Sequence, residues 1–124
     1  MSLNALLGSA GRMKKKDVED FVQRVLTSGE ELVAAYRTKR DSYVFTDRRF
    51  IYEDIQGFTG KKRNIVSIPY SKISAYSVET AGLWDADGEL CLWVSGYASP
   101  VQYEFRSGID VYDIQRILSM YIKE

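Results

Sequence analysis

The sequence of 124 residues contains no histidine. Histidine is the most common general base and a frequent zinc ligand, and it completes the Ser-His and Cys-His nucleophile systems. Its absence therefore excludes most catalytic and zinc sites. No motif for binding a cofactor is present either. We expect a protein that is not an enzyme, with no catalytic residue, no cofactor and no metal ion.

Cysteine and long apolar runs are also scarce. Cys91 is the only cysteine, so a disulfide within the chain is excluded, and an unpaired thiol favours a reducing compartment, here the cytoplasm. Cys91 lies in a strand-like run with no histidine to activate it, so we expect a buried structural cysteine. No apolar run is long enough to cross a bilayer, and we expect no membrane span.

Neither sign of charge is in excess, because Lys plus Arg and Asp plus Glu each number 17. A chain with no net charge has little electrostatic attraction for the phosphate backbone of a nucleic acid, so we expect no nucleic-acid partner. Asp85, Asp87 and Glu89 form an acidic cluster whose spacing is similar to part of a calcium loop. Leu83 and Val94 stand where such a loop requires carboxylates, which favours a solvated turn. These three carboxylates are also the only support for an enzyme.

Two segments have the apolar spacing of amphipathic helices. The first runs from about residue 17 to 28, with Asp17 as the expected N-cap and Gly29 just past its end. The second spans residues 110–124, with Asp110 as the expected N-cap. The apolar stripes are Val18, Phe21, Val22, Val25 and Leu26 in the first helix, and Val111, Ile114, Ile117, Leu118 and Tyr121 in the second.

Between residues 31 and 107 the apolar residues come in short runs separated by turn-forming residues, which is typical of strands. Parallel strands would need crossover helices, for which the chain has no room, so we expect an antiparallel meander. Seven strands with a terminal helix indicate a mainly β barrel or sandwich whose open end the second helix covers. The predicted strands are 31–39, 42–47, 48–54, 63–69, 74–80, 89–95 and 101–107.

Two turns are expected in the first half of the chain. Residues 46–49 separate two aromatic runs and predict a hairpin in which Asp47 adopts left-handed backbone. Gly57 and Gly60 predict a second reversal with positive φ angles, and a basic run at 61–63 follows it.

Trp93 alternates with Leu90, Leu92 and Val94, so it is expected to point away from their apolar face. An outward tryptophan needs cover, either from the first helix or from another chain, and the sequence leaves both interpretations open.

Other exposed positions suggest further contacts. Phe58 and Tyr97 are additional candidates for an interface between chains. Arg37, Lys39 and Arg40 of the first hairpin are candidates for binding an anionic ligand, although their acidic neighbours favour a solvated rim.

The order of several sequence blocks resembles a bacterial pleckstrin-homology-like family of small uncharacterised proteins. The blocks are YVFTDRRFIYED, QGFTGKK, IPYSKISAYSVETAG, ELCLWVSG and DVYDIQRIL, and the similarity covers about residues 1–124. The resemblance implies a single pleckstrin-homology-like domain, in which an N-terminal helical segment (1–30) precedes a barrel of seven strands (31–107) and a C-terminal capping helix (110–124).

The resemblance also implies an assembly. Copies of the chain are expected to form a cyclic ring of five, leaving a hydrophilic surface for an unidentified protein partner. The expected function is thus a homo-oligomeric module for protein–protein interaction. Eukaryotic pleckstrin-homology domains often bind phosphoinositides through basic residues of the first hairpin, where Arg37, Lys39 and Arg40 stand. Binding of an anionic lipid or other anionic ligand is therefore the alternative function.

Overall fold

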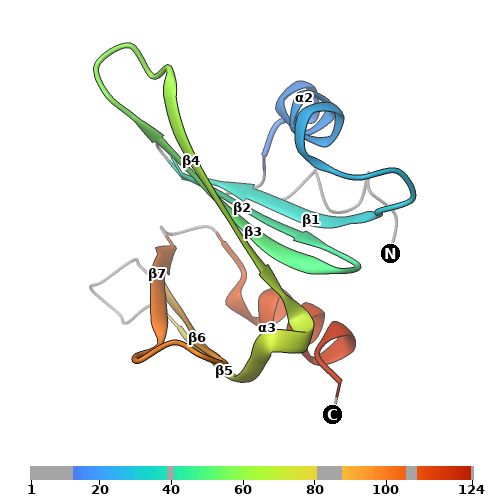
Figure 1. Ribbon diagram of the computed structural model, residues 1–124, viewed down its shortest axis with the longest axis vertical. Helices are drawn as coiled ribbons and strands as arrows, with labels where there is room; N and C mark the ends of the chain where they lie inside the picture. Colours follow the sequence, from blue (N-terminus) through green and yellow to red (C-terminus); the bar gives the residue numbers. More distant parts are fainter. Residues whose placement is uncertain (1–12, 39–40, 81–87, 106–108, 124) are drawn as a thin grey trace. The chain divides into compact units, whose positions relative to one another are not determined.

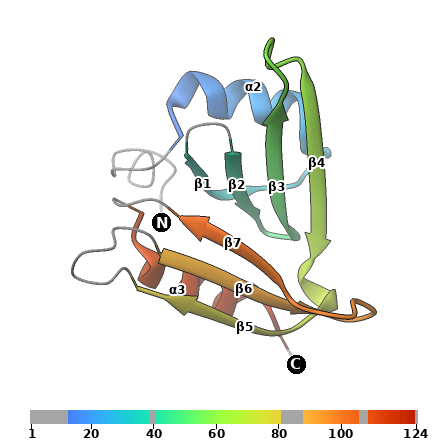
Figure 2. The same ribbon diagram turned by 90° about the vertical axis from the view of Figure 1, so that its left-hand side faces the viewer.

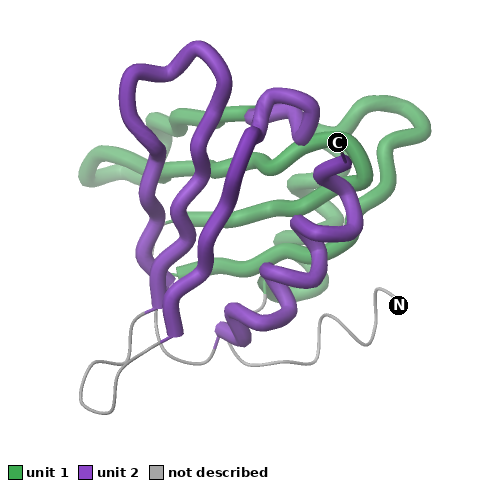
Figure 3. The backbone as a smooth tube through the Cα atoms, turned by 90° about the horizontal axis from the view of Figure 1, so that it is seen from below, with its two compact units in different colours: residues 1–67 green, residues 68–124 purple. Residues whose placement is uncertain are grey.

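The computed structural model describes residues 13–38, 41–80, 88–105 and 109–123 of the chain. It contains two compact units, Met1–Ser67 and Ile68–Glu124, which Figure 3 draws in different colours. Each unit has its own sheet and its own helix.

The first unit contains helix α2 (Lys15–Val25) and the four-stranded sheet β1-β2-β3-β4 (Figure 1). The strands are β1 (Leu32–Arg37), β2 (Asp41–Thr46), β3 (Arg49–Gln56) and β4 (Lys62–Pro69), the last of which ends in the second unit. β1 pairs antiparallel with β2, and β2 with β3.

Helix α2 supplies much of the core of this unit. Its buried side chains Val18 and Phe21 cluster with one row of the sheet, in which Ala35, Val44 and Ile51 are register partners on three neighbouring strands. Complete burial of a side chain the size of phenylalanine stabilises a fold by about 2 kcal/mol. The apolar stripe predicted for the first helix therefore packs against the sheet of its own unit.

The second unit contains a 3₁₀ turn, η1 (Tyr70–Lys72), and the sheet β5-β6-β7. Its strands are β5 (Ile73–Glu79), β6 (Gly88–Val94) and β7 (Val101–Phe105), and helix α3 (Val111–Tyr121) packs against β5 and β6 (Figure 2). The rings of Tyr70 and Tyr121 stack with their centroids 5.8 Å apart, which joins the 3₁₀ turn to the end of α3.

The prediction of a mainly β chain is confirmed. All seven strands are present in two antiparallel sheets, with one helix before them and one after. The second predicted helix also has its predicted N-cap, because the Asp110 carboxylate accepts a hydrogen bond from the Tyr112 N–H at 2.9 Å. Of the helices described, neither combines the length and apolar character that crossing a bilayer would require.

The bounds predicted for the first helix were wrong at both ends. The helix begins at Lys15, and the side chain of Lys14, its N-cap residue, makes no capping bond. Asp17 lies in the first turn, where its carboxylate accepts a hydrogen bond from the Arg37 guanidinium at 3.3 Å. The helix ends at Val25, because the backbone is extended at Leu26. Gly29, with φ of 83°, belongs to the turn that follows.

The hairpin at residues 46–49 is present, but the left-handed backbone predicted for Asp47 was wrong. No described non-glycine residue has a positive φ angle. The turn is held instead by the Thr46 hydroxyl, which accepts the N–H groups of Arg48 and Arg49, each at 3.0 Å. Asp47 bonds to Glu31 through both its backbone N–H and its carboxylate, each at 2.9 Å.

Candidate interaction surfaces

Trp93 lies on β6, the central strand of the second sheet, with 40 % of its surface exposed. Leu90, Leu92 and Val94 on the same strand are buried, so the predicted alternation is confirmed. The sheet thus has one apolar face and one face that carries Trp93, here called the open face. Register places residues 75, 77 and 79 of β5, residues 89, 91 and 93 of β6 and residues 102 and 104 of β7 on the open face.

The backbone around Trp93 is held by an irregularity in β5. The register between β5 and β6 shifts between Ile73 and Ala75, and the hydroxyl of the intervening Ser74 donates to the Trp93 carbonyl at 3.1 Å. Ala75 is the register partner of Trp93. Its methyl group is too small to cover the indole ring, which leaves the large aromatic surface accessible.

An acidic row crosses the other end of the open face. Glu79 on β5 pairs in register with Glu89 on β6, and Glu89 pairs with Glu104 on β7. Like charges directly opposite each other on neighbouring strands repel and destabilise a sheet. Sequence reasoning missed this row, because it depends on the register of three strands.

Tyr97 lies in the turn that follows β6, where its N–H donates to the Val94 carbonyl at 3.1 Å. Its side chain is half-exposed. Burial raises the pKa of Tyr103, and the nearby Tyr97 phenol raises it further. Trp93 and Tyr97, two of the three residues predicted for an interface, are close together in sequence at the same end of β6.

Phe58, the third predicted interface residue, is at the apex of the β3–β4 hairpin and is fully exposed. Gly57 and Gly60 have the predicted positive φ angles, 81° and 66°, and the Gly60 N–H bonds to the Gly57 carbonyl across the turn. The next residues, 61–64, are all exposed and begin with Lys-Lys-Arg. We call residues 57–63 the hairpin tip.

Arg37, predicted to bind an anion, is already paired. Its guanidinium lies 3.3 Å from the Asp17 carboxylate and 3.8 Å from that of Glu53, and its Nε donates to the Ser42 hydroxyl. Arg63 reaches the same Glu53 oxygen at 3.3 Å. Glu53 is completely buried, and neither of its oxygens has a hydrogen-bond partner among the described residues. The two arginines therefore serve first to neutralise a buried carboxylate.

Glu30 has a comparable structural role that the sequence did not reveal. Its buried carboxylate accepts hydrogen bonds from the Arg49 guanidinium at 2.9 Å, the Thr46 hydroxyl at 2.7 Å and the Thr27 N–H at 3.1 Å. Arg49 also donates to the Val25 carbonyl at the end of α2. This network ties the helix to the β2–β3 turn. No local signal in the sequence predicted it, because Glu30 is far in sequence from Thr46 and Arg49.

Two carboxylates, Asp41 and Asp54, face each other across β2 and β3 as register partners. Burial raises the pKa of Asp41, and its hydrogen bond with Asp54 raises it further. Burial and the adjacent Asp41 likewise raise the pKa of the Tyr52 hydroxyl. Gln56 donates a hydrogen bond to Asp54 at 2.8 Å.

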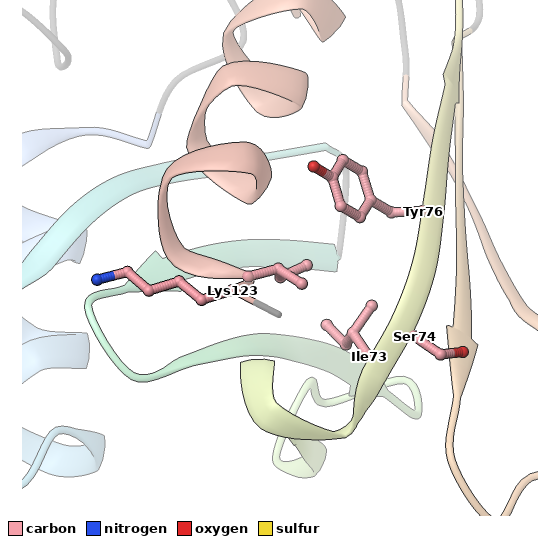
Figure 4. A pocket seen from close by; sticks show the side chains of 5 residues that line it. Ile73, Ser74, Tyr76 and Lys123 are labelled. Atoms are coloured by element: carbon pink, nitrogen blue, oxygen red, sulfur yellow. The ribbon is translucent and has the colours of Figure 1, made fainter.

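An open hollow of about 360 Å³ lies between the start of β5 and the residues just after α3 (Figure 4). Ile73, Tyr76 and Ile122 give it apolar walls. The Ser74 hydroxyl is bonded to the Trp93 carbonyl, and Figure 4 shows the Lys123 ammonium group extending away from Ser74. The polar groups around the hollow therefore do not converge on one ligand.

The family model for the bacterial pleckstrin-homology (PH) domain matches residues 2–122. The chain belongs to the bacterial PH domain family. The uncharacterised protein YjqA of Bacillus subtilis (strain 168) is 44 % identical to this PH domain over 118 residues, which are 94 % of each chain.

Two crystal structures resemble this PH domain over nearly their whole length. A DUF1696 family protein with a pleckstrin-homology domain from Shewanella loihica PV-4 has 39 % identity and a TM-score of 0.81, covering 94 % of this chain and 99 % of the other. A pleckstrin-homology domain from Shewanella amazonensis SB2B has 42 % identity and a TM-score of 0.77, covering 98 % of each. The resemblance seen in the sequence is therefore confirmed.

PH domains are generally not catalytic. In this PH domain, no group of three metal-ligating side chains comes together within the described ranges. Cys91 is buried in β6, as predicted. Asp85 and Asp87 of the predicted acidic turn lie outside the described residues, as do Lys39 and Arg40 of the first hairpin, while Glu89 belongs to the acidic row.

Proposed function

We propose that this PH domain is a non-enzymatic, cytoplasmic interaction module that assembles with copies of itself into a closed ring, with five as the expected number of copies. The observation that carries the proposal is Trp93. Tryptophan on a central strand normally contributes to a core, yet here it is 40 % exposed beside an alanine. Exposed aromatic side chains surrounded by polar residues are typical of protein interfaces and are frequent energetic hot spots.

The surroundings of Trp93 also support an interface between proteins. Ser77, Gln102 and Glu104 on the open face are exposed and polar, so they would form the rim around a central aromatic anchor. Tyr97 adds a second aromatic side chain close to Trp93 in sequence. An assembled ring would leave further hydrophilic surface for an unidentified protein partner.

The mass of the protein in solution tests the assembly. Size-exclusion chromatography with light scattering is expected to give several times the 14.2 kDa of one chain. Trp93→Ala is expected to lower this mass at equal concentration while the far-UV circular dichroism stays unchanged. Truncating a hot spot costs on the order of 2 kcal/mol per contact, or about thirtyfold in affinity.

Tyr112→Ala is the matched control, because Tyr112 is an exposed aromatic residue on α3, outside the open face. This variant is expected to keep the wild-type mass. A wild-type protein that is monomeric at micromolar concentration would contradict the proposed assembly, whatever the variants do.

Binding of an anionic lipid or other anionic ligand at Arg37, Lys39 and Arg40 is the alternative proposal. The existing pairs of Arg37 with Asp17 and Glu53 weigh against it, because a ligand would have to compete with them. Salt-sensitive pulldown on anionic vesicles that is lost in Lys39→Ala/Arg40→Ala, but absent on neutral vesicles, would favour this alternative.

A further inference from the structure

Apart from Arg63, which pairs with Glu53, the hairpin tip has no evident role within its own unit. Phe58 is fully exposed at the apex, and a Cβ atom added at Gly57 would meet no atom within 4 Å. The aromatic ring therefore contributes no packing to the core. At the apex of a basic hairpin, this exposed aromatic side chain is available to contact a binding partner.

The charge of the tip indicates the chemistry of that partner. Lys61, Lys62 and Arg63 follow Phe58, and the sequence contains no acidic residue from Ile55 to Val78. Arg63 is paired with Glu53 at the base of the tip. Lys61 and Lys62 are exposed and form no ion pair with any described residue. The partner should therefore combine carboxylates with an apolar or aromatic surface.

The open face has this combination. Glu79 and Glu89 stand opposite each other in the acidic row and have no ion pair within the described ranges, while Trp93 supplies exposed aromatic surface on the same face. Cations placed on the row would relieve the repulsion between its carboxylates. Charge complementarity thus points to a second copy of this chain.

We propose that the hairpin tip of one copy binds the open face of the next, with Lys61 and Lys62 on the acidic row and Phe58 towards the aromatic part of the face. The inference rests on the proposed assembly and names its contact. Tip and open face are different surfaces, so every copy offers one of each. Such head-to-tail contacts close into rings when the rotation between copies allows it, whereas a two-fold contact would stop at a dimer.

A charge swap tests the contact. Lys61→Glu/Lys62→Glu and Glu79→Lys/Glu89→Lys are each expected to weaken assembly by roughly tenfold or more, because each places like charges together. The four substitutions combined in one chain are expected to restore the wild-type mass. Phe58→Ala should weaken assembly without changing its dependence on salt. Light scattering across a concentration series measures all of these variants.

Lys15→Glu/Lys16→Glu is the matched control, since it reverses two exposed lysines of α2 and is expected to leave assembly unchanged. A monomeric wild-type protein would refute the proposed function as well. An assembled wild type whose mass is unaffected by reversal of the tip would refute only the contact proposed here.

Two further results would also overturn the contact. One is a folded four-fold variant, judged by far-UV circular dichroism, that remains as dissociated as the two double variants. The other is a tip-reversed variant that keeps its assembly but loses binding to phosphatidylglycerol vesicles, which would make an anionic membrane surface the occupant.

Discussion

At the scale of single residues, the Glu30 carboxylate shows how a buried charge is tolerated. Its side chain is only 1 % exposed, and three partners donate hydrogen bonds to it. Chiefly through the hydrogen bond from Arg49, these contacts lower the pKa of Glu30 from 4.5 to about 2. Protonation would remove the acceptor from a guanidinium that also holds the end of α2.

Glu30→Gln is expected to lower the free energy of unfolding at pH 7 by about 3 kcal/mol, the value that the lowered pKa implies. The pKa of Glu30 is lower in the folded state, so its stabilisation is complete above about pH 4.5 and is lost as the pH falls towards 2. The gap between wild type and variant should therefore close over this range in urea titrations. Glu31→Gln, an exposed neighbour, is the control, and a gap that stays constant with pH would contradict the prediction.

At the scale of elements, Gly88 sets the distance between β5, β6 and α3. A Cβ atom at this position would lie 2.9 Å from the Glu79 carbonyl oxygen and 2.9 Å from Cγ1 of Val111, the first residue of α3. Both distances are shorter than van der Waals contact. The absence of a side chain is thus what allows the helix to begin so close to the strand pair.

Gly88→Ala is expected to destabilise the protein by roughly 1–3 kcal/mol, as for other overpacked sites. The Glu79 carbonyl belongs to a paired strand and cannot move away cheaply. Gly57→Ala is the comparison, because its Cβ would enter open space and only the positive φ angle opposes it, at about 1 kcal/mol. Chemical denaturation would measure both variants, and a Gly88→Ala protein as stable as wild type would show that α3 can shift.

Most elements could be predicted because their signals are local. Alternation around Trp93 and the spacing of the α3 stripe depend on near neighbours, and both predictions were confirmed. The start of α2 was missed because the Asp17 carboxylate does not cap the helix. It accepts a hydrogen bond from Arg37, which is twenty residues away. Asp47 was misread for a similar reason, since Thr46 supplies the turn and Asp47 bonds to Glu31.

The surfaces were harder to predict than the elements. Trp93, Phe58 and Tyr97 were found because exposure follows from alternation and from loop position. The pairing of Arg37 with a buried Glu53 was not, because it requires three strands to be in register. The acidic row has the same origin, since Glu79, Glu89 and Glu104 are far apart in sequence.

At the scale of the whole molecule, a net charge of zero conceals local separation of charge. Three cationic side chains lie together in the hairpin tip, and three carboxylates lie together in the acidic row. The formal charges of these six side chains add up to zero, as do those of the whole chain. Balanced composition argues against attraction to long polyanions, but it does not exclude attraction between two copies of the chain. For this protein the arrangement of charge is more informative than its total.

The single thiol gives the protein a built-in reporter of its own opening. Cys91 is buried in the middle strand of the second sheet, with Ser77 and Gln102 as its register partners. A thiol reagent reaches the buried Cys91 side chain when these strands separate locally, so the rate of labelling measures how often β6 opens. Labelling in native buffer is expected to be roughly a thousandfold slower than in urea, if opening costs about 4 kcal/mol. Mass spectrometry would follow the labelling, and equal rates in both solutions would mean that the reagent reaches Cys91 from the open face without opening of β6.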